Sequence, residues 1–573
     1  MVAQSQPNFE ASHSRFEKPV LRDKHSAFVK DLYTLSGNKI LGWILDHKNP
    51  QELVHGLPYE DFFWLFKKIG EDDCLPLLKL ASVDQWEYLL DLEIWKKDRL
   101  NVDHTSLWMK RLQQADCKRL ARWLLSEGKA LAYYYFFKSI QVEKKNEDED
   151  YDLPEGFFRL DGGFQIKAIY PEHQETIENI LRMMASEDFD RCQTLLLGIG
   201  NFLPAEVEEE MYRLRNVRLA EHGFLPFEEA LSIYAPLDPE ALAIEKKPEL
   251  PNILLDDESR AMVPVLPFYH AEVKNMLTDA ASRIMDPLFL DRIRLEFAGL
   301  CNHILSADGI LVDDIEILSK TCRKAAGYLN LALERLCGNS ISSARDLLRS
   351  HPLVSIFRVG FGLALKLKWE TERWLKGSWF YRQGLDVGFW GDQWGETIAG
   401  ILKKKPRLYI GLKEGEEYKD FESLSEIDEC RSLFHRLMVL DKLLERLTEC
   451  YPIENGFIHS KELTFHPLLF NFWSRCFLKL KPCFSGISLG QAKNLFHQLR
   501  AGSEKPPFQM PGGEDNFLKN FLAYCSDFEP EAVAMLKDTL SLVWQKFQKE
   551  YEGVSISYIN GRYSKFFTIT TSL

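Results

Sequence analysis

The chain has 573 residues, and its 71 Lys and Arg against 85 Asp and Glu give a formal net charge of −14 at pH 7. Hydrophobic residues make up 45% and charged residues 27%, which excludes a fibrous, mucin-like or wholly disordered protein. The acidic balance argues against a protein whose whole surface binds nucleic acid, because such surfaces are basic.

The sequence predicts a cytoplasmic protein without membrane insertion. The N-terminal residues MVAQSQPNFEASHSRFEKPV lack the apolar core of a signal peptide. No stretch reaches the roughly 18 consecutive apolar residues that a membrane-spanning helix needs. The 11 cysteines include no C-x-x-C pair, and their scatter and odd number are typical of reduced thiols.

The first part of the chain is predicted to be helical. Residues 1–35 form a partly ordered N-terminal segment and residues 36–142 a helical-repeat domain. Residues 57–66 can be laid over residues 81–90, an offset of 24 at which apolar positions coincide. A third unit at 112–125 has a different offset, so the repeat is irregular. Short amphipathic helices at such a period usually stack on one another.

Local signals mark where these helices begin and end. Asn49, Pro50 and Glu52 have the spacing of an N-cap, a proline at the first helical position and a capping-box acid. Ser82 and Gln85 form a second predicted capping box. Pro58 opens another helix, which we expect to end at Gly70.

The middle of the chain alternates between charged or proline-rich breaks and helical regions. Residues 143–154 are predicted to be an acidic linker, and residues 155–235 a region of a hairpin plus helices. The hairpin covers 157–170 and turns at Asp161-Gly162. Residues 236–267 contain six prolines and are predicted to be a linker.

The remainder is predicted to be a helical domain at 268–502, a loop at 503–515, and a C-terminal helix and hairpin at 516–573. The last hairpin covers 555–569, with Asn560-Gly561 as a type I′ turn. Helical patterns occur at 288–306, 314–336, 424–450, 488–500 and 516–550, and a short strand is expected near 408–412. The predicted fold class is therefore mainly α, with several domains and small β-hairpins.

Two resemblances follow from particular segments. The sequences LVHGLPYEDFFWLFKKIG and LLKLASVDQWEYLLDLEIW resemble the cytosolic superhelical domain of a magnesium-transporter family, although this chain has no membrane spans to gate. The whole chain resembles an uncharacterised bacterial family, defined as a domain of unknown function. That resemblance is carried by LLDLEIWKKDRL, EEEMYRLRNVRLAEHGFLPFEEALSIYAPLDP and SADGILVDD. It implies a bacterial cytosolic protein with no assigned reaction.

Motifs of known chemistry are missing from the sequence. It contains no phosphate-binding G-x-x-x-x-G-K-[ST], no H-E-x-x-H and no G-x-S-x-G. Glu52 and His55 lack the second copy that a di-iron site needs, and the acids after Asp308 lack the ligand spacing of a calcium loop. We therefore expect no cofactor and no metal, and the catalytic residues, if there are any, are unknown.

Residues 356–413 differ from the rest of the chain in composition. The segment holds five of the 13 tryptophans and 11 basic against five acidic side chains, a charge of +6 in a chain that otherwise sums to −20. Tryptophan beside cations is typical of stacking sites, cation–π contacts and interface hot spots. Large aromatic side chains also fill cores. Core packing is therefore the first interpretation, a binding surface the second and a catalytic pocket the third.

The candidate ligand or partner surface consists of Trp374, Trp379, Arg382, Trp390, Asp392, Trp394 and Glu396, and the candidate basic patch of Lys403, Lys404, Lys405 and Arg407. In the sequence FWGDQWGE, the two tryptophans and the two acids each share a face if the segment is helical. If glycine keeps the segment a loop, it would close over a pocket.

Three functions remain open at this point. The first is a non-enzymatic helical scaffold or regulatory protein with a protein partner, for which we expect an exposed groove or surface. The second is an enzyme or small-molecule binder with a pocket around 370–396. The third and weakest is nucleic-acid binding by the basic, tryptophan-rich segment.

Overall fold

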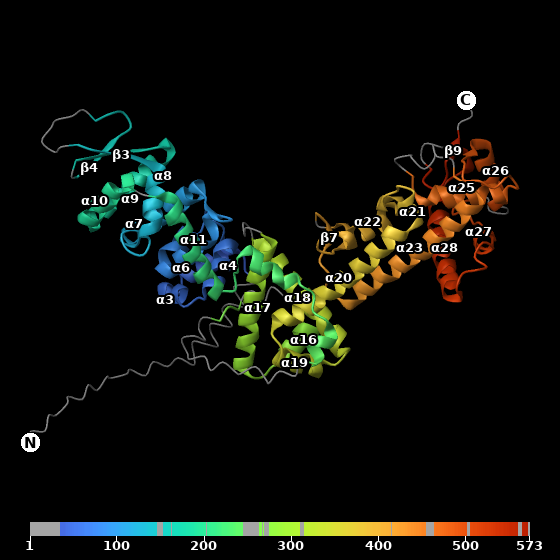
Figure 1. Cartoon of the computed structure of the whole chain (residues 1–573), viewed down its shortest axis with the longest axis horizontal. Coiled ribbons are helices and arrows are strands. Elements are labelled where there is room, and N and C mark those ends of the chain that lie inside the picture. The colour runs from blue at the N-terminus through green and yellow to red at the C-terminus, as the bar shows by residue number, and fades with distance from the viewer. Residues whose placement is uncertain are drawn as a thin grey trace, which may run out of the picture. The chain divides into compact units, whose positions relative to one another are not determined.

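The computed structural model describes residues 35–145, 153–161, 163–201, 203–244, 263–265, 268, 274–309, 315–413, 415–453, 463–500, 505–559 and 564–570. These residues form a mainly α protein with small sheets, as the sequence predicted (Figure 1). Some predictions lie outside the described residues. They are the N-terminal segment up to residue 34, the acidic run 146–152, the proline-rich stretch 245–262 and the Asn560-Gly561 turn.

Contacts divide the chain into two compact units, Met1–Arg358 (unit 1) and Val359–Leu573 (unit 2). The finer domain ranges given above stay predictions. The two units differ in charge: the formal net charge is −15 for unit 1 and +1 for unit 2.

The described residues of unit 1 form many helices and two small sheets. Its helices are α2 (Gly37–Leu45), α3 (Pro50–His55), α4 (Tyr59–Ile69), α5 (Leu75–Leu80), α6 (Val83–Glu93), α7 (Val102–Leu124), α8 (Lys129–Ser139), α9 (Gln174–Glu187), α10 (Phe189–Gly198), α11 (Pro204–Glu221), α12 (Phe227–Ala230), α13 (Pro239–Ile244), α16 (Met276–Ser282), α17 (Pro287–Asp308), α18 (Ile315–Cys337) and α19 (Ile341–Ser350). Its strands are β1 (Trp95–Lys96), β2 (Arg99–Leu100), β3 (Ile140–Lys144), β4 (Phe158–Leu160) and β5 (Phe164–Ala168). Short 3-10 turns lie at Pro171–His173, Ile199–Asn201 and Leu231–Tyr234.

The predicted overlay of 57–66 on 81–90 corresponds to two real helices. Helix α4 starts at Tyr59 and α6 at Val83, 24 residues later. The overlaid positions Phe62 and Trp86 are both buried, at 0% and 1% exposure, so both helices turn this position toward the core. The proposed third unit lies inside the longer helix α7, which bends at Asp116.

The helix caps differ in how well the sequence predicted them. The capping box of α6 is confirmed, because the Gln85 N–H donates to Ser82 Oγ at 3.1 Å and the Ser82 N–H donates to Gln85 Oε1 at 2.9 Å. Gly70 ends α4 as predicted. The cap of α3 was wrong in detail: Asn49 makes no side-chain cap, and its amide instead donates to Glu52 at 2.9 Å.

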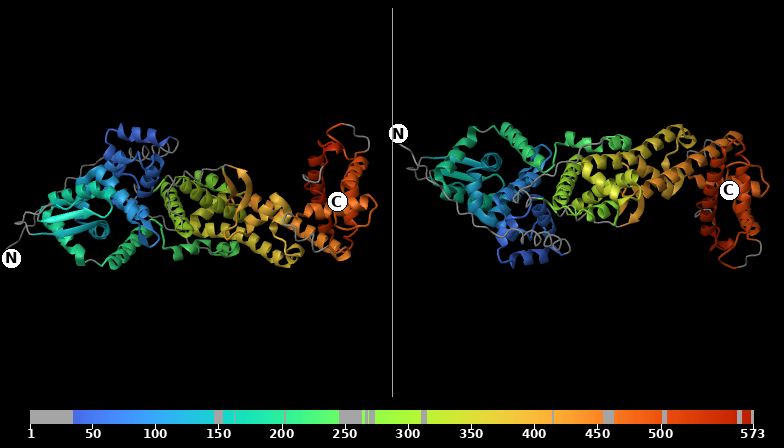
Figure 2. Two further views of the ribbon diagram at one scale, coloured as in Figure 1. Left: turned by 90° about the horizontal axis from the view of Figure 1, so that it is seen from above. Right: turned by 90° about the horizontal axis from the view of Figure 1, so that it is seen from below.

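The predicted hairpin at 157–170 is confirmed and acquires a third strand. Strands β4 and β5 pair antiparallel, with Phe158 opposite Ile166. Strand β3 pairs with the other edge of β5 and continues to Lys144, so the predicted acidic linker begins inside a strand. Helix α9 packs on this sheet, drawn in cyan in Figure 2.

Helix α11 docks through polar contacts because it has almost no apolar face. Glu208 is buried and accepts hydrogen bonds from Arg99, the Leu100 N–H and the Tyr134 hydroxyl at 2.8–3.0 Å. One turn before the end of the helix, the Arg218 guanidinium donates two 2.8 Å bonds to the Asp91 carboxylate. This charged helix is therefore anchored by specific polar contacts.

Unit 2 begins within the long helix α20 (Leu353–Gly377), which crosses the division between the units. The elements that follow are α21 (Trp379–Arg382), the 3-10 turn η4 (Val387–Trp390), α22 (Gly391–Leu402), β6 (Leu408–Lys413), β7 (Glu416–Lys419), α23 (Leu424–Cys450), α25 (Phe465–Phe477), β8 (Ile487–Ser488), α26 (Leu489–Leu499), α27 (Gly513–Leu522), α28 (Pro530–Tyr551), a 3-10 turn at Ile556–Tyr558, and β9 (Ile569–Thr570). The strand expected near 408–412 is confirmed as β6. The helix expected over 516–550 is two helices, because Pro530 starts the second one.

Helices α20 and α23 run side by side and in the same direction (Figure 1). The pairs that join them advance together along both sequences: Glu370 contacts Arg431 at 3.5 Å, and Trp374 contacts Phe434 with ring centroids 5.5 Å apart. Helix α22 and the β6–β7 hairpin connect the two, and α22 packs against both β6 and α23. This connection holds most of the predicted site.

The predicted hairpin at 555–569 was wrong. Residues 556–558 form a 3-10 turn, and Ile569 pairs in parallel with Ile487 of β8. The physical reason is aromatic packing: Phe566 and Phe567 are 6% and 3% exposed and contact Phe547 of α28. Burying these two phenylalanines holds the segment against α28, and the strand that follows it pairs with β8.

We predict that Gly486→Ala destabilises unit 2 by about 1–3 kcal/mol, the usual cost of overpacking. A Cβ at Gly486 would overlap the Thr568 carbonyl oxygen, which belongs to the segment that β8 holds in place. The free energy of unfolding in urea measures the effect. Gly490→Ala is the matched control: its Cβ meets nothing closer than 4.0 Å, so equal losses in both variants would contradict the prediction.

Candidate functional site

The tryptophans of the predicted site lie in the core of unit 2. Trp390 is 1%, Trp379 4% and Trp394 7% exposed, and Trp374 is half-buried. The Trp390 ring centroid lies 5.2 Å from Phe380 and 5.7 Å from Phe465, and Trp394 stacks on Phe465 at 5.3 Å. The structure thus brings these rings together as packing between helices.

Local chain geometry explains how the segment around Trp390 reaches the core. The Asp386 carboxylate accepts the Gly388 N–H at 2.9 Å and starts the turn η4. Gly391 then takes a positive φ of 79°, which glycine alone adopts without strain. A Cβ at Gly395 would meet the Val387 carbonyl oxygen at 2.5 Å, so this glycine lets α22 pack directly on η4. The segment FWGDQWGE is helical from Gly391 onward rather than a loop over a pocket.

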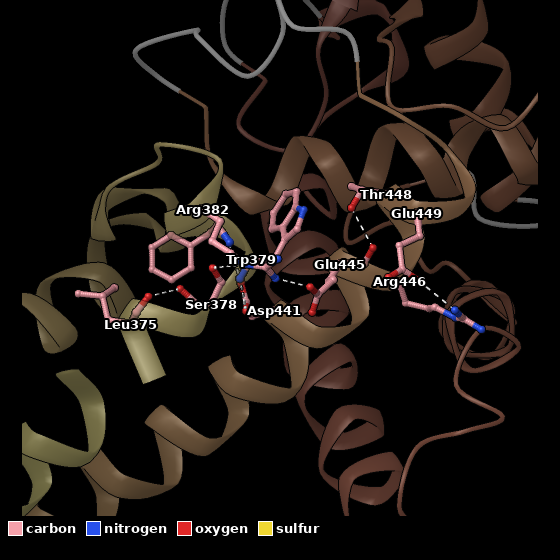
Figure 3. Close-up of polar contacts among 10 residues, drawn as sticks. Leu375, Ser378, Trp379, Arg382, Asp441, Glu445, Arg446, Thr448 and Glu449 are labelled. Atoms are coloured by element: carbon pink, nitrogen blue, oxygen red, sulfur yellow. Dashed lines mark hydrogen bonds and ion pairs between the residues drawn. The ribbon is translucent and has the colours of Figure 1, made fainter. Parts of the chain in front are cut away.

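A buried carboxylate holds the start of α21. Asp441 of α23 is 4% exposed, and its two oxygens accept the backbone N–H groups of Trp379 and Phe380 at 2.8 and 3.1 Å (Figure 3). These are two of the amides that a helix N-terminus leaves without partners. Burial raises the Asp441 pKa to about 6, against the opposing effect of the Phe380 and Trp379 N–H donors.

The charged residues of the predicted site are engaged separately. Arg382 is exposed and forms an ion pair with Glu445 of α23, also drawn in Figure 3. Glu396 is half-buried and accepts the hydroxyl of Tyr418 from the hairpin. Asp392 is exposed. The three side chains are therefore not gathered around one shared partner.

The predicted basic patch borders the hairpin and α20. Lys403 and Lys404 are exposed, while Lys405 and Arg407 are half-buried. The Lys403 ammonium lies 3.1 Å from the centroid of the Tyr418 ring, and burial lowers its pKa, with Arg407 adding to the effect. Arg407 lies 3.7 Å from the Asp420 carboxylate.

Two buried nitrogens next to the aromatic cluster have no hydrogen-bond partner among the described residues: Trp390 Nε1 and His466 Nε2. Burial, with a smaller contribution from Lys546 and Lys565, lowers the pKa of His466 to about 3. The imidazole is therefore neutral at neutral pH, and its Nε2 is shielded from solvent. A general acid or base needs access to its substrate, which this histidine lacks.

The predicted site did not include a row of exposed side chains on α20. On α20, Lys366, Trp369, Arg373 and Lys376 are all exposed and are spaced by three, four and three residues. We call these four residues the basic stripe. Their spacing along one helical face is visible in the sequence, but the predicted site consisted mainly of tryptophans that the fold buries. Asp441 was missed as well, and its signal was a lone acid among the core leucines of α23.

The described residues were also compared with the requirements of a metal site, a ligand cavity and a membrane span. Among them, no group of three His, Cys, Asp or Glu side chains is placed to hold a metal ion. A cavity of about 310 Å³ lies in unit 1, lined by Leu124, Leu125, Lys129, Arg191, Thr194 and Leu195. Of the helices that the structure describes, none combines the length and apolar character needed to cross a bilayer.

Comparison with known families covers nearly the whole chain. Residues 21–570 match a family described as "Family of unknown function (DUF6178)". The chain belongs to this family. No curated protein and no solved structure matches the chain significantly, so membership in DUF6178 brings neither an activity nor a known fold. The resemblance to an uncharacterised family is confirmed, whereas nothing supports the resemblance to magnesium transporters.

We predict that Trp390→Ala lowers the free energy of unfolding by about 3–5 kcal/mol, the usual cost of emptying a large buried aromatic site. Trp369→Ala, in a side chain that is 45% exposed, is the matched control and should change stability by less than about 0.5 kcal/mol. Urea unfolding measures both. Similar losses in the two variants would show that Trp390 is not part of the core.

A second prediction concerns pH. Because folding raises the Asp441 pKa from 3.8 to about 6, its charge costs folding free energy above pH 6 and nothing below pH 3.8. Compared with Asp441→Asn, the wild type should gain about 2 kcal/mol of stability between pH 7 and about pH 4.5. Urea unfolding of both proteins at the two pH values measures how the difference in their free energies of unfolding changes with pH. A difference that does not change with pH would mean that Asp441 titrates normally.

Proposed function

We propose that this DUF6178 protein is a non-enzymatic helical scaffold or regulatory protein that works by binding another protein. One observation carries the proposal. In the segment where the sequence concentrates its unusual residues, the rings of Trp379, Trp390 and Trp394 fill the core, while cations of α20 remain exposed. Buried rings make a rigid support, and exposed side chains on a rigid helix make a surface that a partner can recognise.

The net charges of the two units favour a protein partner over nucleic acid. Unit 2 sums to +1 and unit 1 to −15. A chain of this charge repels nucleic acid at long range, although Lys403 and Lys404 are exposed. Recognition of a partner through a few specific contacts therefore fits this chain better than long-range attraction by net charge.

We further propose that the protein is cytoplasmic and bacterial. All 11 cysteines are free thiols. Cys301 and Cys322 lie with their sulfurs 3.6 Å apart and are not bonded. Thiols left unbonded at such a distance fit a reducing compartment. The bacterial assignment rests on the resemblance stated above.

A small-molecule binder is the second candidate, and the cavity of about 310 Å³ in unit 1 favours it. Its lining pairs leucines with Lys129 and Arg191, which suits an anion with an apolar part. This cavity lies in a different unit from residues 370–396, where the sequence had placed a pocket.

Gentle purification of the tagged chain from its native host tests the proposal. We expect a partner protein to be retained at low salt and cross-linked to residues of unit 2, with the cross-linked peptides read by mass spectrometry. Native mass spectrometry of the same sample weighs any retained small molecule. A chain that is recovered alone, or that carries a small molecule and no protein, would contradict the scaffold function.

The nucleic-acid alternative has its own test. Neutralising Lys403, Lys404 and Lys405 to Gln should leave single-stranded oligonucleotide binding unchanged at physiological salt, because we expect that binding to be negligible already. Tight binding that falls steeply with salt and with these substitutions would favour the alternative.

A further inference from the structure

The outward face of α20 in unit 2 presents the basic stripe as a straight row. Residues spaced by three and four positions share one face of a helix, and the row from Lys366 to Lys376 spans about 15 Å at 1.5 Å per residue. The opposite face is core: Ala364, Leu367 and Thr371 are each 0% exposed. The stripe is therefore held on a helix that packing prevents from rotating.

The acids that flank the stripe on α20 pair with other cations. Glu370 lies 3.5 Å from Arg431, and Glu372 lies 3.6 Å from Lys368. Arg373 and Lys376 form no ion pair with any described residue. Glu370 and Glu372 thus already have partners. The side chains of Arg373 and Lys376 can still bind a carboxylate of another molecule.

A loop is fastened to a neighbouring side of α20. The Lys368 ammonium donates to the carbonyl oxygens of Lys403 and Lys404 at 2.9 and 3.3 Å, so the end of α22 is fastened beside α20. Lys404 is exposed and forms no ion pair with a described residue. Trp369, 45% exposed, adds an apolar ring among these cations.

We propose that the basic stripe, with Lys404 beside it, binds a short acidic segment of a partner protein; this rests on the proposed protein-binding function and names the chemistry of the partner. Carboxylates of the segment pair with Arg373, Lys376 and Lys404, and Arg373 can bind one of them in bidentate fashion. An aliphatic or aromatic side chain of the segment packs on the Trp369 indole. The partner segment is acidic with interspersed apolar residues.

Two other anionic partners fit the stripe less well. Single-stranded nucleic acid needs successive aromatic platforms for its bases, and the stripe has one ring. A membrane surface needs an apolar helix face as well as cations, and the stripe again offers Trp369 alone. A linear row of cations around one ring matches a peptide segment in both length and composition.

Fluorescence anisotropy of a short fluorescein-labelled peptide of Glu-Glu-Leu repeats tests the proposal with the full-length chain. We expect saturable binding that weakens about tenfold in Arg373→Glu/Lys376→Glu, because two exposed charge pairs are replaced by repulsion, and about threefold in Trp369→Ala. The control Lys537→Glu/Lys549→Glu makes the same charge change at exposed lysines of α28 and should bind like the wild type. Circular dichroism confirms that each variant is folded.

The outcomes separate this inference from the proposed function. Absence of peptide binding, or equal loss in the stripe and control variants, overturns the stripe assignment, while a cross-linked partner from the native host would still uphold the protein-binding function. Tighter binding of a labelled single-stranded oligonucleotide or of phosphatidylserine vesicles, lost in the stripe variant, also overturns it in favour of that anion.

Discussion

Burial of Trp390 is the constraint on which the second unit depends. The ring lies where α20, η4, α22 and α25 converge, and its neighbours Phe380 and Phe465 come from segments far apart in the sequence. A ring of this size is stable there only if every surrounding element contributes surface to it. Gly391 and Gly395 then permit the close approach of η4 and α22, and Asp441 fixes the start of α21.

This packing decides which chemistry of the segment faces outward. Three of its tryptophans are buried, and four of its five acids make a cap, an ion pair or, as Glu396 does with Tyr418, a hydrogen bond to a hydroxyl. The rigid outer face of α20 remains, with Trp369 exposed between cations. The tryptophans and cations of this segment therefore do not form one binding site. Buried residues lie on the core side of α20, and Trp369 and the cations lie on its outer side.

The accuracy of the sequence predictions depended on how local the deciding interactions are. Helices α4 and α6 were predicted with their offset of 24 residues because caps and apolar spacing act within a few residues. The hairpin of β4 and β5 was predicted for the same reason, whereas β3 was missed because its partner β5 lies beyond an acidic run. The C-terminal hairpin failed because Phe566 and Phe567 pack on α28, a contact that no local pattern reports.

By itself, the sequence determined the mainly α class, many helix boundaries, the family DUF6178 and the position of the unusual segment at 356–413. Only the tertiary structure decided that Trp390 is core, that Asp441 caps a distant helix and that the basic stripe stays exposed. The physical reason is that periodicity and capping are properties of neighbouring residues. Burial depends instead on which distant surface meets a side chain, and only the packed chain contains that information.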